Sequence, residues 1–212
     1  MIIYTANFGD KDVVKEPLIR PDNTKFVYFT DRPFESDVWD VVIDNQQGDS
    51  NRIAKWYKIN SHEVFPGEST VWIDASIGVL SDPTEFFQGW DNMLVRKHRD
   101  RNDIYEEAEA CILSDRDPAA VRIQIAEYMQ QGHPRNTGLY INSILFRKPT
   151  AATTDLNRAW WQEIKRHSFR DQLSLPYALR IQGTLVKEVE YSHFGDCFSG
   201  RRRHKFPGSK EI

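Results

Sequence analysis

Val71-Trp72-Ile73-Asp74-Ala75-Ser76 is an apolar run that ends in a carboxylate. Such a run is typical of a buried strand, and Asp74 would then lie where this strand leaves its sheet. In open α/β sheets, ligands bind outside the carboxyl ends of the strands, where a carboxylate can hold a divalent cation that neutralises a substrate diphosphate. We therefore expect Asp74 to anchor a nucleotide-sugar site, although Asp also commonly closes a strand by capping a turn.

Apolar segments and helix-start signals alternate along the rest of the chain. Ser50 and Asp117-Pro118 are typical helix starts, and Asp82-Pro83-Thr84-Glu85 combines a capping residue, a proline and a reciprocal glutamate. We expect strands over residues 2–6, 25–30, 38–43, 139–147 and 184–191, helices over 50–62, 117–132 and 154–167, and helical starts near 83 and 170. This alternation predicts one α/β sandwich with a mostly parallel, mixed central sheet.

The composition is ordinary for a globular domain. The 212 residues are 40% hydrophobic and 28% charged, enough for one sizeable core, and the formal net charge of -3 argues against a general nucleic-acid binder. Cys111 and Cys197 have no metal-binding spacing, which fits a reducing compartment. Because the first residues lack a signal-peptide pattern and no stretch approaches the ~18 apolar residues of a membrane span, we expect a cytoplasmic protein.

The last residues differ from the rest of the chain. A basic run, Arg201-Arg202-Arg203-His204-Lys205, precedes Phe206-Pro207-Gly208. We expect one domain over residues 1–195 and a basic tail or linker over 196–212, which could lead into further domains. Nucleic-acid binding by this run is an alternative that the acidic overall balance disfavours.

Three cations recur at three-residue steps on the helix predicted from Ser50, namely Arg52, Lys55 and Lys58. At about 100° per residue, these steps spread the charges over roughly a third of the helix circumference. A diphosphate could dock there, beside the first strand ends, although Lys and Arg side chains normally face water.

Two further residues could carry chemistry. His193 follows the last predicted strand, where an imidazole could complete a divalent metal shell begun by a carboxylate, although a lone His is more often structural. Asp171 lies between basic Arg170 and the amide of Gln172, so it could act as a general base, a nucleophile or a sugar clamp. A helix-start motif formed by Ser168 and Asp171 is the alternative.

Several motifs are specific in combination. They are 51–58 (NRIAKWYK), 72–76 (WIDAS), 98–101 (HRDR), 104–108 (IYEEA), 160–164 (WWQEI) and 168–173 (SFRDQL). Together they resemble a family of GT-A-type glycosyltransferase domains formerly of unknown function, and a multi-domain chlorella-virus member is especially similar. The resemblance covers roughly residues 1–195. It implies a GT-A fold, a UDP-sugar donor, a divalent cation (Mn²⁺ or Mg²⁺) and, for a viral protein, the host cytoplasm.

The resemblance also assigns roles by position. Asp74-Ala75-Ser76 takes the place of an Asp-X-Asp motif, with Ser76 where the second acid often ligates metal. The implied roles are metal ligation for Asp74 and His193, uridine contact for Thr5, Ala6, Asn7 and Asp31, pyrophosphate contact for Arg52 and Lys58, and catalysis for Asp171.

We therefore expect a metal-dependent transferase that moves a hexose or deoxyhexose from a UDP-sugar to a glycan or glycoprotein acceptor, with retention at the anomeric carbon. Tyr140, Asn142 and Trp161 are the expected acceptor-side residues because aromatic faces stack on sugars, with core packing as the alternative for Trp161. A catalytically silent nucleotide-sugar or glycan-binding module is the alternative function, because the second acid of the motif is missing. We expect no nucleic-acid partner and no membrane span.

Overall fold

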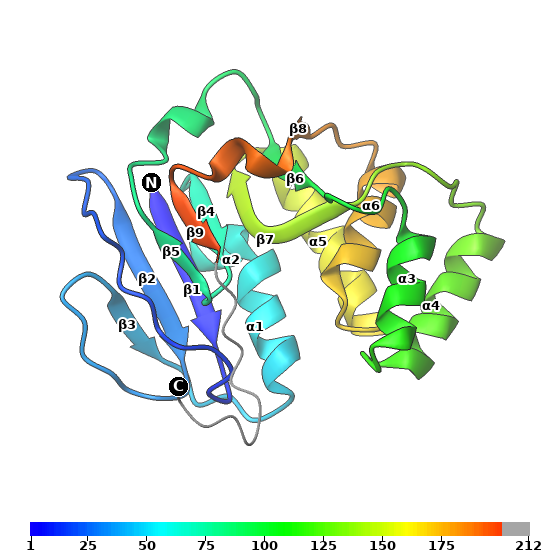
Figure 1. The fold of residues 1–212 in the computed structure, drawn as a ribbon, viewed down its shortest axis with the longest axis horizontal. Helices are drawn as coiled ribbons and strands as arrows, with labels where there is room; N and C mark the ends of the chain where they lie inside the picture. Colours follow the sequence, from blue (N-terminus) through cyan, green and yellow to red (C-terminus); the bar gives the residue numbers. More distant parts are fainter. Residues whose placement is uncertain (201–212) are drawn as a thin grey trace.

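A mixed sheet of seven strands organises the molecule, in the order β3-β2-β1-β4-β7-β6-β8 (Figure 1). The computed structural model describes residues 1–200. The strands are β1 (Ile2–Asn7), β2 (Lys25–Thr30), β3 (Asp40–Ile43), β4 (Thr70–Ile73), β6 (Met93–Lys97), β7 (Tyr140–Arg147) and β8 (Lys187–Val189). All neighbouring pairs are parallel except those made by β7, which runs antiparallel to both β4 and β6. The predicted fold class, a Rossmann-like α/β domain with a mostly parallel mixed sheet, is confirmed.

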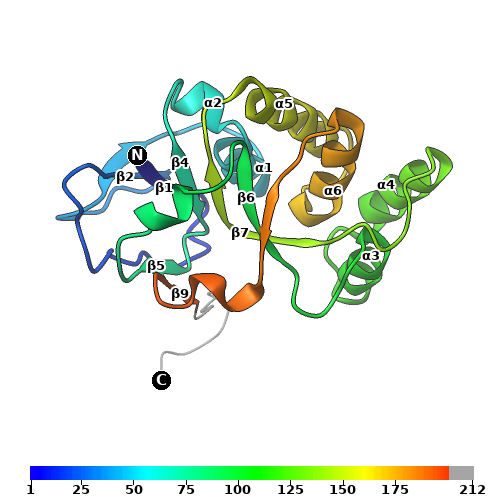
Figure 2. The same cartoon turned by 90° about the horizontal axis from the view of Figure 1, so that it is seen from above.

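Helices cover one face of this sheet (Figure 2). They are α1 (Ser50–Ile59), α2 (Ser61–Val64), α3 (Ile104–Leu113), α4 (Pro118–Gln130), α5 (Ala151–Arg166) and α6 (Asp171–Gln182). Helix α1 contacts β1 and α6 contacts β7, α5 packs against α1, α2 and α6, and α3 and α4 form a pair that reaches the sheet through α6. The apolar side chains of α5 that face the core include Leu156, Trp160 and Ile164, which follow the spacing of one helix face.

A thinner layer covers the other face. It consists of a two-stranded ribbon, β5 (Ile77–Val79) with β9 (Phe198–Gly200), and two short 3₁₀ turns, η1 (Thr84–Phe87) and η2 (Tyr191–Phe194). Phe194 and Phe198 pack there on Phe146 of β7. Because β1 lies between both layers, its side chains are buried on both faces, as expected for a central strand of a parallel sheet.

The structure differs from the sequence prediction at several points. The helix from Ser50 ends at Ile59 and not near residue 62, because Asn60 leaves the helical conformation and its side chain donates to the Trp56 carbonyl. Strands β5 and β6 and helix α3 were not predicted. The apolar run of β6 is only Met93-Leu94-Val95, too short to give a periodic signal.

Three residues that the sequence prediction assigned to the tail form a strand. Strand β9 pairs with β5, so residues 198–200 belong to the folded unit. The basic run at residues 201–205, and the prediction of a linker there, lie outside the described residues. No helix within residues 1–200 combines the length and the apolar character that crossing a bilayer requires.

A buried hydrogen-bond cluster fixes the end of α1 against the sheet. Arg147 of β7 donates to the Tyr4 hydroxyl at 3.0 Å and to the Lys58 carbonyl at 2.7 Å. The Tyr4 hydroxyl lies 3.2 Å from the carbonyls of both Tyr57 and Lys58. A cation and a hydroxyl thus satisfy carbonyls that the helix leaves unpaired at its carboxyl end. Tyr4 of β1 and Arg147 of β7 thus hold the Lys58 backbone in place.

We expect Tyr4→Phe to lower the free energy of unfolding by about 1–3 kcal/mol, because it removes the hydroxyl that donates to the Tyr57 carbonyl and accepts from Arg147 Nη1. Tyr28→Phe is the matched control, since Tyr28 is also buried but its hydroxyl has no hydrogen-bond partner within residues 1–200. Urea unfolding of both variants measures the difference. Equal losses would contradict the role of the Tyr4 hydroxyl.

Candidate functional site

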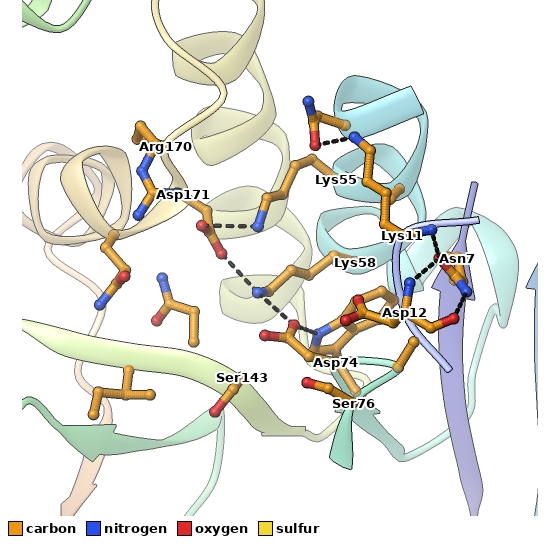
Figure 3. Close-up of a pocket in the computed structure, with 18 of the residues that line it drawn as sticks. Asn7, Lys11, Asp12, Lys55, Lys58, Asp74, Ser76, Ser143, Arg170 and Asp171 are labelled. Atoms are coloured by element: carbon orange, nitrogen blue, oxygen red, sulfur yellow. Dashed lines mark hydrogen bonds and ion pairs between the residues drawn. The ribbon is translucent and has the colours of Figure 1, made fainter. Parts of the chain in front are cut away.

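A cavity of about 480 Å³ opens at the carboxyl ends of β1 and β4 (Figure 3). Its walls come from the loop after β1, the inner face of α1, the segment after β4, the start of β7 and the start of α6. This is the edge at which open α/β sheets bind ligands, and the volume suits a small-molecule site.

A chain of alternating charges crosses the centre of the cavity. Lys55 Nζ lies 2.9 Å from Asp171 Oδ1, and Lys58 Nζ lies 2.7 Å from Asp171 Oδ2. Lys58 Nζ also lies 3.1 Å from Asp74 Oδ1, which accepts a second hydrogen bond from Trp72 Nε1 at 2.9 Å. Lys58 therefore bridges two carboxylates that come from β4 and α6 (Figure 3).

Helix α1 delivers both lysines for local reasons. The Asp49 side chain caps the helix by accepting from the backbone N–H groups of Asn51 and Arg52. Lys55 and Lys58 are three residues apart and so share one face, and the hydrogen bonds to the Lys58 carbonyl hold its backbone. The result is a buried ammonium group at a fixed position.

The charge chain shifts the pKa values of its members. Burial opposes ionisation of Asp171, but Lys55 and Lys58 outweigh it and hold the pKa of this carboxyl well below its usual range. Burial opposes ionisation of Asp74 too, and Lys58 and Lys55 lower its pKa. Burial alone would lower the pKa of Lys58, yet Asp171 and Asp74 raise it. These three groups are charged at neutral pH.

Lys55 is the exception in this chain. Burial lowers its pKa to about 8, because Asp171 offsets only part of the desolvation penalty and Lys58 adds repulsion. Its positive charge is therefore lost a little above physiological pH, which makes it the one lysine in the chain Lys55–Asp171–Lys58–Asp74 whose charge changes near that range.

Asp171 lies in the cavity, but its surroundings limit what it can do. Both carboxylate oxygens are ion-paired with lysines, and the low pKa makes it a poor acceptor for a proton. Of the roles expected for Asp171, this geometry favours a clamp that holds sugar hydroxyls or stabilises positive charge over that of a general base.

The loop after β1 forms the opposite wall. Asn7 Oδ1 accepts from the backbone N–H groups of Lys11 and Asp12, both at 3.3 Å, and Asn7 Nδ2 donates to the Asp12 carbonyl at 2.8 Å. Ala6 and Asn7 line the cavity. At Gly9, where φ is +74°, an added Cβ would meet the Ser50 side chain at 3.2 Å, so the close approach of loop and helix favours glycine.

Two residues expected beside the uridine lie outside this wall. Thr5 is fully buried in β1 and does not line the cavity. Asp31 does not line it either; its Oδ2 accepts from the Gly9 N–H at 2.9 Å and thereby fixes the loop. Side chains alternate along β1, so Thr5 lies on the face of Ile3, which packs in the core on the side of the sheet away from α1.

Arg52 corrects another expectation. Its guanidinium donates to the Ile164 carbonyl and, at 2.8 Å, to the His167 carbonyl at the end of α5, so it does not line the cavity. Arg52 is three residues before Lys55 and six before Lys58, and the accumulated rotation turns it toward α5. Lys55, which sequence reasoning named but did not assign, takes the place expected for Arg52.

His193 is not brought to Asp74 in the cavity wall. It lies on η2, exposed, with its ring 5.2 Å from the ring of Phe86, and it does not line the cavity. Within residues 1–200, no three His, Cys, Asp or Glu side chains converge on a common point. Of the two residues expected to ligate a metal, only Asp74 lines the cavity.

The remaining oxygen donors in the cavity fit a cation whose coordination shell is completed by oxygens of the substrate. Mg²⁺ is usually held by one or two carboxylates together with waters and substrate phosphates, and not by a cage of protein ligands. Asp74 is 35% exposed and Ser76 lines the same cavity, so both offer oxygens (Figure 3). The chemistry of this donor set fits a hard divalent cation bound together with a diphosphate.

The three residues expected on the acceptor side lie in three different places. Asn142 lines the cavity, is 2% exposed, and neither side-chain atom has a hydrogen-bond partner within residues 1–200. Tyr140 lines a neighbouring cavity of about 310 Å³ and donates to Glu188 at 2.6 Å. Trp161 is half-buried against the core under α5 and lines neither cavity, in line with a packing role.

Sequence reasoning missed several cavity residues. Lys11, Arg101, Arg116 and Arg170 line the wall, together with Glu107, and none was assigned a role. Arg101 and Arg170 lie inside the motifs 98–101 and 168–173, which was the available signal. Their convergence depends on α3, which was not predicted.

A comparison with protein-family models identifies the family of this chain. A family model described as TOD1/MUCI70, glycosyltransferase-like domain, matches residues 28–204. The matched segment contains Lys55, Lys58, Asp74 and Asp171 and therefore the whole charge chain. No curated protein matches the chain.

We expect the Lys55 side chain to titrate near pH 8, which NMR of protein with ¹³C-labelled lysine Cε measures directly. Lys55→Arg identifies the resonance by removing it. In Asp171→Asn the pKa of Lys55 should fall further, because the carboxylate that favours the ammonium form is lost. Titration close to the ordinary lysine value of about 10.4 would contradict the burial of this group.

Proposed function

Because the chain belongs to the TOD1/MUCI70 glycosyltransferase-like domain family, we propose that it transfers a hexose or deoxyhexose from a UDP-sugar to a glycan or glycoprotein acceptor. The observation that carries this proposal is the ammonium group of Lys58, buried between Asp74 and Asp171 at the ligand-binding edge of the sheet. The family match supports a sugar transferase over the alternative of a silent binding module.

The donor would lie along the wall from the β1 loop to Asp74. Ala6 and Asn7 would contact the nucleoside, and Lys58 and Lys55 would contact the diphosphate. When the glycosidic bond breaks, negative charge grows on the diphosphate, and fixed cations stabilise it without reorganisation. The ion pairs of Lys58 hold its ammonium group where that charge would develop.

We propose Mn²⁺ or Mg²⁺ as the cofactor, held by Asp74 with Ser76 as a further oxygen donor. When bound, such a cation supplies Lewis-acid stabilisation of the leaving diphosphate. Lys58, which pairs with the same carboxylate, would supply a second positive charge.

Asp171 would orient the transferred sugar. With both oxygens on lysines, it can still accept hydrogen bonds from sugar hydroxyls, and its negative charge faces the positive charge that develops at the anomeric carbon. Asn142 offers an unpaired donor and an unpaired acceptor in the same cavity, which suits a hydroxyl-rich ligand. The two free cysteines support the proposal of a reducing compartment such as the cytoplasm.

For Asp74→Asn we expect metal-dependent transfer from a UDP-sugar to fall by about 10²-fold or more, because the amide cannot neutralise a divalent cation. Asp155→Asn, an exposed change on α5, is the matched control. The added thermal stability given by UDP with Mn²⁺ should be reduced in Asp74→Asn alone. Full activity in that variant would remove Asp74 from the mechanism.

We also expect the product to keep the anomeric configuration of the donor. An enzyme that inverts needs a general base to activate the acceptor, and the paired, low-pKa Asp171 is unsuited to that role. The ¹H NMR coupling constant at the new anomeric position measures the outcome. An inverted product would show that another residue acts as base.

A further inference from the structure

A third cavity, of about 240 Å³, lies at the amino end of β4, whereas the candidate site lies at its carboxyl end. Thr70 begins β4 and Arg147 ends β7; the two residues are partners in the antiparallel pair, and both line this cavity. Helix α2 and the start of α5, which lie side by side, supply further walls (Figure 2). The candidate site has twice this volume, so the third cavity suits a ligand much smaller than a sugar nucleotide.

Arg147 brings a buried positive charge to this cavity. Its side chain is only 1% exposed. Nη1 donates to the Tyr4 hydroxyl and Nη2 to the Lys58 carbonyl, and both acceptors are neutral. Within residues 1–200 no carboxylate pairs with this guanidinium, and its Nε has no hydrogen-bond partner. Since a buried charge is costly unless an opposite charge compensates it, an anion in the cavity would supply the missing partner.

Two neutral donors line the cavity beside Arg147. The Thr70 side chain is buried, and its hydroxyl has no hydrogen-bond partner in the described part of the chain. His62 also lines the cavity, and burial lowers the pKa of its imidazole, so the ring is neutral at pH 7. Asn157 Nδ2 donates to His62 Nδ1 at 3.4 Å, which leaves the ring proton on Nε2. This buried Nε2 has no hydrogen bond either; the nearest carboxylate oxygen, of half-exposed Glu63, is 3.6 Å away.

The other charged groups on the cavity wall do not neutralise Arg147. They are Lys148 and Glu68, which have opposite signs, so the wall keeps one net positive charge. The Lys148 ammonium donates to the Trp90 carbonyl. Buried polar atoms are normally paired, and three unpaired donors around one net positive charge are the pattern that an oxyanion completes.

We propose that this cavity is a second anion-binding site, which takes a phosphate or carboxylate group of a small ligand on Arg147, Thr70 and His62. Guanidinium groups form strong charge-assisted hydrogen bonds with both kinds of oxyanion, and a hydroxyl and an imidazole N–H can donate to the remaining oxygens. The site is separate from the charge chain Lys55–Asp171–Lys58–Asp74 and does not depend on the proposed transferase function.

Arg147 connects this second anion site with the candidate site. The guanidinium that would hold the anion also donates to the Lys58 carbonyl, and Lys58 pairs with Asp74 and Asp171. An anion that fixes the guanidinium would therefore also steady the end of α1. A ligand of the second site is thus placed to act on the candidate site without entering it.

The test follows the Arg147 Nε–H and the Thr70 backbone amide in ¹H–¹⁵N NMR spectra while sodium phosphate, sodium acetate or sodium chloride is added at constant ionic strength. We expect saturable shifts of both signals with phosphate, acetate or both, with a dissociation constant of about 1 mM or lower, and none with chloride. A response to phosphate alone assigns a phosphorylated ligand, and a response to acetate alone assigns a carboxylate.

Thr70→Val, which removes one donor and keeps the shape of the side chain, should weaken this binding about tenfold. His62→Phe removes a donor on another element and should cause a similar loss. Thr5→Val is the matched control, because Thr5 is also buried with an unpaired hydroxyl within residues 1–200 but lines none of the three cavities. Its affinity should be unchanged.

The absence of saturable shifts with both oxyanions would overturn the inference. So would shifts centred on Lys55 and Lys58 in place of Thr70, since the anion would then bind in the candidate site. Equal loss of affinity in Thr5→Val and Thr70→Val would overturn it as well, because the Thr70 hydroxyl would have no specific part in binding.

Discussion

The buried ammonium group of Lys58 is the constraint on which the candidate site depends. It ties β4 to α6 through Asp74 and Asp171, two carboxylates that are far apart in the sequence. Two like charges this close would repel strongly without a cation between them. The position of Lys58 depends in turn on Arg147 and Tyr4, which hold the end of α1 on the sheet. The fold and the site thus share one network.

This network pairs the charges at the centre of the cavity. Each buried charge at its centre has an opposite partner within 3.1 Å, which offsets the cost of removing it from water. Lys55 is paired less completely and its pKa falls to about 8. The charges at the centre therefore balance one another, while Arg101, Arg116 and Arg170 carry the surplus positive charge of the cavity wall.

The sequence predicts the fold class and the strand end before Asp74, but not the directions of side chains. The alternation of strands and helices predicted the α/β sheet, and the apolar run before Asp74 correctly located a strand end. The antiparallel direction of β7 depends on contacts with β4 and β6 and has no local signal. Arg52 and Lys55 are equivalent by spacing alone, and only the packing of α1 against α5 separates them. His193 does not line the cavity either, and its ring lies against that of Phe86, a contact that has no local signal in the sequence.

Binding of an anion at the centre must exchange interactions that already exist. A diphosphate that approaches Lys58 competes with Asp171, which holds the ammonium at 2.7 Å, more closely than Asp74 does at 3.1 Å. If Asp74 held the proposed cation, Lys58 would lose part of the attraction of that carboxylate. If the ion pair of Asp171 with Lys55 or Lys58 were broken, one carboxylate oxygen would become available to accept a hydrogen bond from a sugar hydroxyl. In the proposed function, Lys58 would then couple donor binding to the release of Asp171, and so would link stabilisation of the leaving group to positioning of the sugar.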